Sequence, residues 1–249
     1  MQPASLSRRP SLRHALRLLT ALLLLGLAGT ASVWAQASAN EIRIGVLNDQ
    51  SGTYAAATGA GSVVAAKLAV EDAGSVLGRP VQVLAADHQF KPDVGASIAR
   101  RWYDEGVTAI FDLYHSGVGL AVQDIAKSKN KIVMAEVNSM LFTNEQCSPN
   151  GFSWGTDGYS LATIISKGVS EGKPTSWYFI TVDYTAGHST EQEARKIIEA
   201  GGSKVLGSVR FPAGSADFSS FILSAQSSKA HPFQGLFKAA CLSTRAVET

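Results

Sequence analysis

The segment IRIGVLNDQSGTYAAATGAGS, residues 42–62, joins an apolar run to a polar turn and then to a series of small residues. Residues Ile42 to Leu47 have the β-branched composition of a strand that is buried in a parallel sheet. Residues Ala55 to Ala73 carry apolar side chains at helical spacing. The segment therefore predicts the first strand and the first helix of an α/β fold.

The same alternation of strand and helix continues along the chain. Further strands are expected at residues 81–86, 108–113, 131–135, 177–181 and 204–209, and further helices at residues 91–107, 119–128, 161–171, 187–200 and 218–226. Parallel strands need crossover connections, which are usually helices. The order therefore predicts an α/β protein with doubly wound parallel sheets.

A polar segment, NEQCSPNGFSWGTDGYS at residues 144–160, interrupts the alternation. It divides the chain into a first α/β lobe at residues 41–150 and a partial second α/β lobe at residues 151–228. Residues 229–249 lack the β-branched strand that should come next, and we interpret them as a divergent tail. Because open parallel sheets bind ligands at the carboxyl ends of their strands, a ligand is expected between the lobes.

Residues 1–37 have the composition of an export signal. Four arginines and no acidic residue surround or precede the apolar run of residues 18–27, and small residues allow cleavage after Ala35 or Ala37. The apolar run is shorter than the roughly 20 residues that a spanning helix needs, which favours cleavage over a permanent anchor. The SRRPSL segment at residues 7–12 is also typical of a twin-arginine signal, so two export routes stay open.

Charge and cysteine content argue against several classes of protein. The whole chain has a formal net charge of +2, but residues 1–37 carry the excess and the remainder has about −2. Without a cluster of Lys and Arg, the sequence gives no electrostatic indication of nucleic-acid binding. Cys147 and Cys241 are far apart and lack the spacing of a metal site, although a disulfide is open to an exported protein.

Motifs for catalysis or cofactor binding are not indicated either. Gly59-Ala60-Gly61 lies too far beyond the first strand to match a dinucleotide fingerprint, and no GxSxG nucleophile motif occurs. His115 and Ser116 are adjacent in sequence, a geometry in which a catalytic pair rarely forms. His88, His115 and His188 stand in separate loops without the spacing of metal ligands. We therefore expect no enzyme activity, no cofactor and no metal.

Three loop residues keep two interpretations each. Ser51 could cap the following helix or contact a ligand, and Asp157 could cap a helix or face the cleft between the lobes. Tyr54 could reach the cleft or simply pack in the core.

Five segments carry a resemblance to a known family. They are IRIGVLNDQSGTYA at 42–55, GSVVAAKLAVED at 61–72, LGRPVQVLAADHQFKPDVGASIARRW at 77–102, SWYFITVDYTAGH at 176–188 and GSVRFPAGSADFSSFILSAQ at 207–226. In this order they resemble the type I periplasmic solute-binding proteins of branched-chain amino acid ABC transporters, similar to leucine-binding proteins. The resemblance covers about Glu41 to Ser228. It implies a periplasmic, two-lobed protein that closes on a small ligand without chemistry and delivers it to a membrane permease.

The resemblance also implies the residues that hold the ligand. A ligand carboxylate would be bound after the third and fourth strands by hydroxyls and backbone N–H groups, at Ser116, Gly117, Asn138 and Ser139. N–H groups at a helix start beside a hydroxyl form a suitable anion site. Tyr184 from the second lobe would cover the ligand, and Tyr54 and Tyr159 would also face it.

The sequence departs from leucine-binding relatives at the expected site. Tyr114-His115 replaces smaller residues and Asn138-Ser139 replaces a pair more like Ala and Thr, so the ligand stays open among a branched-chain amino acid, an amide and a carboxylic acid. Family members are longer, and we expect a truncated or frame-shifted product that diverges near Ser228. The second-lobe acid that pairs with a ligand ammonium would fall beyond Thr249. A periplasmic sensor of the same fold and a non-functional truncated product are the alternatives.

Overall fold

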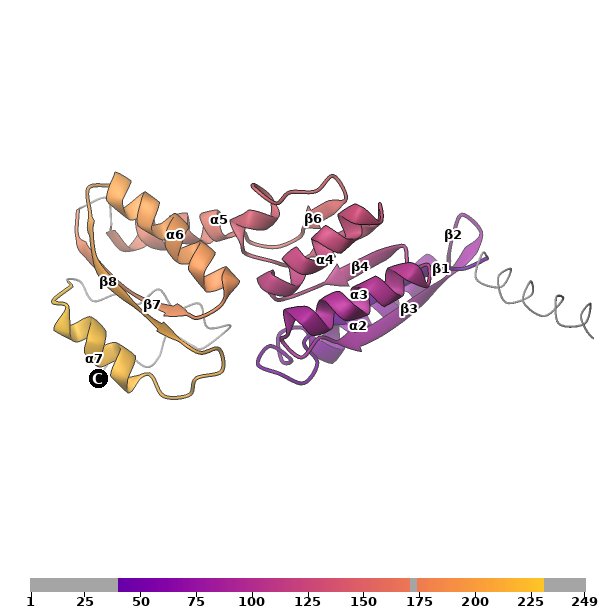
Figure 1. The fold of residues 1–249 in the computed structure, drawn as a ribbon, viewed down its shortest axis with the longest axis horizontal. Coiled ribbons are helices and arrows are strands. Elements are labelled where there is room, and N and C mark those ends of the chain that lie inside the picture. The colour runs from indigo at the N-terminus through magenta and orange to yellow at the C-terminus, as the bar shows by residue number, and fades with distance from the viewer. Residues whose placement is uncertain (1–39, 171–173, 231–249) are drawn as a thin grey trace, which may run out of the picture.

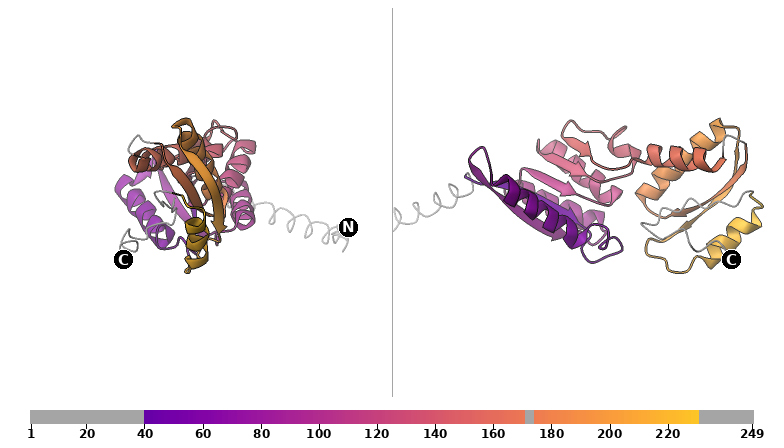
Figure 2. Two further views of the ribbon diagram at one scale, coloured as in Figure 1. Left: turned by 90° about the vertical axis from the view of Figure 1, so that its left-hand side faces the viewer. Right: turned by 180° about the vertical axis from the view of Figure 1, so that it is seen from behind.

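The computed structural model of the chain describes residues 40–170 and 174–230. These residues form two α/β lobes that lie side by side along the long axis of the molecule (Figures 1 and 2). The expected export signal at residues 1–37 lies outside the described residues. So do residues 231–249 of the expected tail. No helix within the two described ranges is long and apolar enough to cross a membrane.

The first lobe is built on a six-stranded sheet with the order β2-β3-β1-β4-β5-β6. Its strands are β1 (Ile42–Asn48), β2 (Ser75–Val76), β3 (Arg79–Asp87), β4 (Ala109–Asp112), β5 (Ile132–Ala135) and β6 (Gly151–Ser153). Every neighbouring pair is parallel except β2 and β3, which are antiparallel. The carboxyl ends of the parallel strands therefore meet at one edge of the sheet.

Three helices pack on this sheet, namely α2 (Gly59–Ala73), α3 (Pro92–Asp104) and α4 (Ser116–Ser128). Helices α3 and α4 lie together on one face, and α2 lies on the other (Figures 1 and 2). The buried cluster under α3 and α4 includes Leu47, Trp102 and Ile110. Trp102 lies so close to Gly45 that a Cβ atom there would come within 2.4 Å of the indole ring. This packing holds β1 and β4, and hence the loops at their ends, in place.

The expected start of the first helix at Ala55 is wrong. Residues 50–58 form bends and turns, and α2 begins at Gly59, whose φ of +42° suits a glycine. The capping interpretation of Ser51 is also wrong, because the residue before α2 is Thr58, whose side chain makes no capping hydrogen bond. The hydroxyl of Ser51 instead donates to the Asp87 carboxylate over 2.5 Å, which joins the loop after β1 to the end of β3.

The face of the sheet under α2 is only partly covered. A groove of about 650 Å³ lies between α2 and this face and continues over β4, β5 and the segment after β6. Phe111, Met134 and Trp154 line it, and Trp154 is 77% exposed. Phe152 on β6 is also half exposed. Within the described part of the chain, an apolar surface of the sheet is thus open to solvent on this side.

The second lobe contains a two-stranded parallel sheet of β7 (Ser176–Val182) and β8 (Lys204–Phe211). Helices α5 (Gly158–Ser170) and α6 (Thr185–Ala200) pack on one face, and α7 (Ser219–Ser227) packs on the other (Figure 1). Each face has its own small core, one around Trp177 and Phe179 and the other around Phe211 and Ala225. The described part of this lobe therefore has much less buried apolar surface than the first lobe.

The alternation of elements agrees with the α/β fold expected from the sequence. Two short strands were not expected: β2, which has two residues, and β6, which pairs with β5. Because β6 belongs to the first sheet, that sheet extends to Ser153, beyond the expected lobe boundary at residue 150. Cys147 is exposed with a free thiol, and Cys241 lies outside the described residues.

Candidate functional site

Four aromatic rings of the first lobe gather beyond the ends of β1, β3 and β4. Tyr54 lies with its ring centroid 5.2 Å from Phe90 and 5.3 Å from Tyr114. The rings of Phe90 and His115 meet edge to face at 4.1 Å. We call Tyr54, Phe90, Tyr114 and His115 the aromatic box. Three loops supply it because their strands end at the same edge of the sheet.

The second lobe contributes Tyr184, which lies against the aromatic box. Its ring centroid is 5.1 Å from His115, 5.4 Å from Phe90 and 6.3 Å from Tyr54. The hydroxyls of Tyr54 and Tyr184 are 3.2 Å apart and share a hydrogen bond. The structure therefore brings together two residues that the sequence assigned to opposite lobes.

A buried carboxylate orients Tyr54. Asp49 is fully buried after β1, and its two oxygens accept the backbone N–H groups of Gly52 at 2.8 Å and Tyr54 at 2.9 Å. A Cβ atom at Gly52 would come within 2.6 Å of this carboxylate, so the turn needs glycine. Next to it, the Asn48 amide donates to the Gly59 carbonyl and to Asp112. These bonds fix the loop through its backbone, while the buried Tyr54 side chain contacts the rings around it and Tyr184.

Two histidines at the site, His115 of the box and His88 next to it, are neutral and each accepts a backbone N–H group at Nδ1. Nδ1 of His115 accepts the N–H of Val118 at 3.1 Å, and Nδ1 of His88 accepts the N–H of Phe90 at 3.1 Å. A neutral imidazole that accepts at Nδ1 carries its proton on Nε2. Burial lowers the pKa of His115 to about 4 and also lowers the pKa of His88. Both rings therefore present an N–H at neutral pH, not a positive charge.

The tyrosines of the site are also neutral. Burial raises the pKa of Tyr54, Tyr114 and Tyr184 above the ordinary value. Nearby carboxylates add to this effect, with Asp49 acting on Tyr54 and Glu136 acting on Tyr114. The site thus consists of uncharged rings, of which all but Phe90 carry a hydroxyl or N–H group.

Three of the four expected anion-binding residues, Ser116, Gly117 and Ser139, come together beside the box. Ser116 and Ser139 are only 2% and 3% exposed, and the N–H of Ser139 donates to the Ser116 hydroxyl over 3.3 Å. Ser116 and Gly117 open α4, whose first N–H groups have no acceptor within the helix. A Cβ atom on Gly117 would come within 3.0 Å of the His115 ring, so the start of α4 lies directly against the box.

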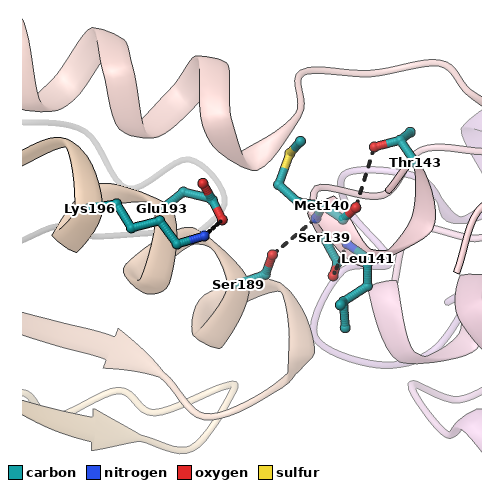
Figure 3. Close-up of polar contacts among 7 residues, drawn as sticks. All are labelled: Ser139, Met140, Leu141, Thr143, Ser189, Glu193 and Lys196. Carbon is teal, nitrogen blue, oxygen red and sulfur yellow. Dashed lines mark hydrogen bonds and ion pairs between the residues drawn. The ribbon is translucent and has the colours of Figure 1, made fainter. Parts of the chain in front are cut away.

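A second contact between the lobes lies next to Ser139 (Figure 3). The N–H of Met140, in the short 3-10 helix η1 (Met140–Phe142), donates to the Ser189 hydroxyl of α6 over 3.0 Å. Ser139 accepts the N–H of Leu141 over a longer 3.4 Å. A cavity of about 220 Å³ lies here, and Met140, Ser189 and Lys196 are among the residues that line it.

Asn138 and Tyr159 have a different environment from the other expected site residues. The Asn138 side-chain amide donates to the Thr156 carbonyl, and the backbone carbonyl of Asn138 accepts the N–H of Gly158 at 2.8 Å. Asn138 therefore shapes the connection between the lobes. Tyr159 is half exposed at the start of α5 and makes no ring contact with the aromatic box among the described residues. Asp157 caps α5, since it accepts the N–H of Ser160 at 2.6 Å.

Phe90 was missed by the sequence reasoning. Gln89 and Phe90 both have positive φ angles, of 54° and 59°, and so do Asp112 and Leu113 at the end of β4, with 81° and 54°. Residues other than glycine rarely adopt a positive φ unless the surroundings impose it. Residues held in this backbone conformation cluster at functional sites. The available signal was an aromatic residue three positions after the end of β3, in a segment that the sequence assigned to a loop.

Comparisons with known proteins agree on one family. A family model described as periplasmic binding protein matches residues 41–235. A solved periplasmic binding protein from Burkholderia mallei is 38% identical with a TM-score of 0.76, over 79% of this chain and 53% of that chain. No match was found among curated proteins.

Two further solved structures extend this comparison. A branched chain amino acid ABC transporter periplasmic ligand-binding protein from Burkholderia xenovorans is 36% identical with a TM-score of 0.63, over 76% of this chain and 52% of that chain. A solute-binding protein of an ABC transporter from R. palustris, in complex with benzoate, shares the fold with 21% identity and a TM-score of 0.69, over 79% and 55%. The chain spans about half the length of these relatives.

Proposed function

Because the chain belongs to the periplasmic binding protein family, we propose that it is the substrate-binding component of an ABC importer. In this role it captures a small solute in the periplasm and delivers it to a membrane permease, and no bond is made or broken. The Burkholderia xenovorans relative supports this role, since it is described as the ligand-binding protein of such a transporter. Export by the expected signal at residues 1–37 is part of the proposal.

The contact between Tyr54 and Tyr184 carries the proposal. The two hydroxyls meet across the lobes at 3.2 Å, at the carboxyl ends of β1 and β7. This is where open parallel sheets bind ligands. A ligand held between these rings would be in contact with both lobes at once, as capture by closure requires.

In this proposal, different residues contact the two ends of the ligand. Ser116, Gly117 and Ser139 offer hydroxyl and N–H donors to a carboxylate, while Tyr54 and Tyr184 cover the rest of the ligand. Asn138 contributes indirectly, because it bonds to the connection between the lobes and would not contact the ligand. Tyr159 lies at the margin of the site. The ligand classes in this proposal are a branched-chain amino acid, an amide and a carboxylic acid.

Ligand binding can be tested by intrinsic-fluorescence thermal unfolding with leucine, acetamide and benzoate. A ligand at 100 times its Kd stabilises a protein by about 2.7 kcal/mol, which raises Tm by several degrees. Ser116→Ala should weaken the effect of a carboxylate ligand about tenfold, whereas the exposed Lys67→Ala on α2 serves as the matched control. The transport proposal fails if no amino acid, amide or carboxylate raises Tm.

A further inference from the structure

A buried amide on α4 bonds to a segment outside its own helix. Gln123 is 1% exposed, and its Nε2 atom donates to the carbonyl of Phe142 at 3.1 Å and to that of Gln146 at 2.8 Å. Both carbonyls belong to residues 139–146, which contain η1 and the turn after it, and which we call the η1 segment. The two bonds use both N–H groups of the amide and hold the η1 segment against α4.

The orientation of this amide leaves its oxygen without a partner. Within residues 40–170 and 174–230, Gln123 Oε1 is buried and accepts no hydrogen bond. Turning the amide over would place Oε1 against two carbonyl oxygens, which cannot donate to it. A buried acceptor without a partner is costly, and a methionine of similar length would avoid this cost. Packing alone therefore does not account for a glutamine at this position.

The same amide also meets the start of β6. A Cβ atom on Gly151 would collide with Gln123 Oε1, so the amide leaves room only for glycine there. Strand β6 is followed by the connection that leads into α5 of the second lobe. Gln123 thus lies where α4, the η1 segment and the strand before this connection come together.

The η1 segment carries two groups of the candidate site. The N–H of Phe142 donates to the Ser139 carbonyl at 3.2 Å, so the bond from Gln123 to Phe142 acts on the turn that holds Ser139. The next N–H along the chain, that of Met140, donates to Ser189 on the second lobe (Figure 3). A displacement of the η1 segment would therefore move both the expected carboxylate site and a contact between the lobes.

A bound carboxylate would compete for the direct bond between Ser139 and Ser116. This bond is long, at 3.3 Å, and its two groups are the ones proposed to bind the ligand. Gln123 lies about two helical turns beyond Ser116, or roughly 10 Å along α4, so a carboxylate at the start of the helix would not reach it. The bonds of Gln123 can therefore persist when the ligand takes the two serines.

We propose that Gln123 is a positioning residue for ligand capture. It keeps Ser139 beside Ser116 in both the free and the bound state. It also keeps the N–H of Met140 within reach of Ser189, so that the carboxylate site and the contact between the lobes are held by one side chain. This inference rests on the proposed function and identifies what maintains the geometry of the same site.

Amide exchange, followed by NMR without any ligand, is the first test. Gln123→Met removes both donors and keeps an unbranched side chain of similar length. Exchange of the Ser139 and Met140 amides should accelerate about fivefold or more relative to the amides of β1, because the segment loses two hydrogen bonds. Val122→Ala, at a fully buried position of the same helix, is the control for a general loss of stability and should leave this ratio unchanged.

Affinity gives a readout that a purely structural role would not change. In isothermal titration with benzoate and with leucine, Gln123→Met should weaken binding about 3- to 10-fold, as expected when one hydrogen bond to the ligand is misplaced. Val122→Ala should change affinity less than twofold at a temperature at which both variants are folded.

A second pair of variants tests the same residue if Gln123→Met does not fold. Gly151→Ala pushes against the amide and should also weaken binding, since Gly151 has no positive φ that would itself require glycine. Combining it with Gln123→Ala removes the collision, so the double variant should bind no more weakly than Gln123→Ala alone. An additional loss in the double variant would contradict an effect through Gln123.

The outcomes separate this inference from the proposed function. Equal acceleration of Met140 exchange by Gln123→Met and Val122→Ala would overturn the inference, as would unchanged affinity in Gln123→Met. Ligand capture itself would still stand in either case. Absence of binding by benzoate, leucine and acetamide to the unmodified chain would instead contradict the proposed function, and the inference with it.

Discussion

The two lobes contribute to the same site but differ in how they are supported. The first lobe presents Tyr54, Phe90 and His115 from loops that follow a six-stranded sheet with one large buried cluster. The second lobe presents Tyr184 and Ser189 from the start of α6, next to a two-stranded sheet with two small cores. Among the described residues, the loops of the first lobe thus rest on a larger core than the start of α6 does.

Removal of a core tryptophan should give the largest difference between the lobes. Trp102 and Trp177 are 5% and 2% exposed, and replacing either by Ala should cost about 3–5 kcal/mol. Trp102→Ala should destabilise the whole chain, whereas Trp177→Ala should open the second lobe and leave β1 and β4 protected. Hydrogen exchange resolved by peptide would distinguish the two variants. Equal loss of protection in both lobes after Trp177→Ala would mean that the lobes unfold as one unit.

Acid should destabilise the first lobe before the second. His115 is neutral in the fold with a pKa of about 4, while an unfolded histidine titrates near 6.5, so the unfolded state binds more protons between these values. Stability should therefore fall by up to about 3 kcal/mol as pH drops from about 6.5 to about 4. Urea unfolding between pH 7 and pH 4.5 would measure this loss, and His115→Gln should reduce it.

Glu191 in the second lobe gives the matched comparison. Its burial acts to raise its pKa, but the Thr181 side chain, together with Arg195 at 3.0 Å and Arg210 at 3.8 Å, outweighs burial and brings the pKa below 4.5. A carboxyl of this kind loses its stabilising effect only as pH falls below 4.5. Glu191→Gln should therefore leave the loss above pH 4.5 unchanged. If it removes that loss instead, the assignment to His115 is wrong.

The contact between Met140 and Ser189 should have a smaller effect. Ser189→Ala removes one hydrogen bond between the lobes and should cost about 1 kcal/mol, or about fivefold in the opening equilibrium. Exchange of the Met140 amide, followed by NMR, should accelerate by this factor. Ser224→Ala on α7 removes an exposed bond within one helix and serves as the control. Unchanged exchange at Met140 would show that this bond does not hold the lobes together.

The ion pair of Lys196 with Glu193 should have the smallest effect (Figure 3). The two groups are 2.8 Å apart on α6, but the Lys196 side chain is 60% exposed and solvent screens the charges. Lys196→Ala should therefore change the free energy of unfolding by less than about 0.5 kcal/mol. A larger change in the free energy of unfolding, measured with urea, would indicate that the ion pair of Lys196 with Glu193 helps to maintain the structure around the cavity beside Ser189.

The family and the α/β fold could be predicted from the sequence, and both are confirmed by the comparisons and the structure. Strands such as β1 and β7 are β-branched runs that carry their own local signal. Strand β6 has no such signal, because it consists of Gly151, Phe152 and Ser153 and is defined by its pairing with β5. The start of α2 was misplaced because small residues after Tyr54 suit a helix equally well, while Asp49 imposes a turn on them.

The candidate site could be predicted only in pieces. Tyr54 and Tyr184 were each expected near a ligand, but their meeting depends on the relative position of the lobes, which no local pattern encodes. Phe90 was missed because its place in the box depends on an unusual backbone conformation. Ser116 and Ser139 could be expected together because both follow neighbouring strands of one sheet.

The apolar groove on the α2 side of the first sheet, as the described residues form it, affects how this protein should be handled. The groove that Phe111, Met134 and Trp154 line offers a site to environment-sensitive dyes such as ANS, which bind exposed apolar surface. The folded chain should therefore give a high dye signal at low temperature, as a molten globule would. Melting curves that rely on such a dye would make the folded chain look less ordered than it is. Emission from Trp102 and Trp177 in the cores is the better reporter of folding.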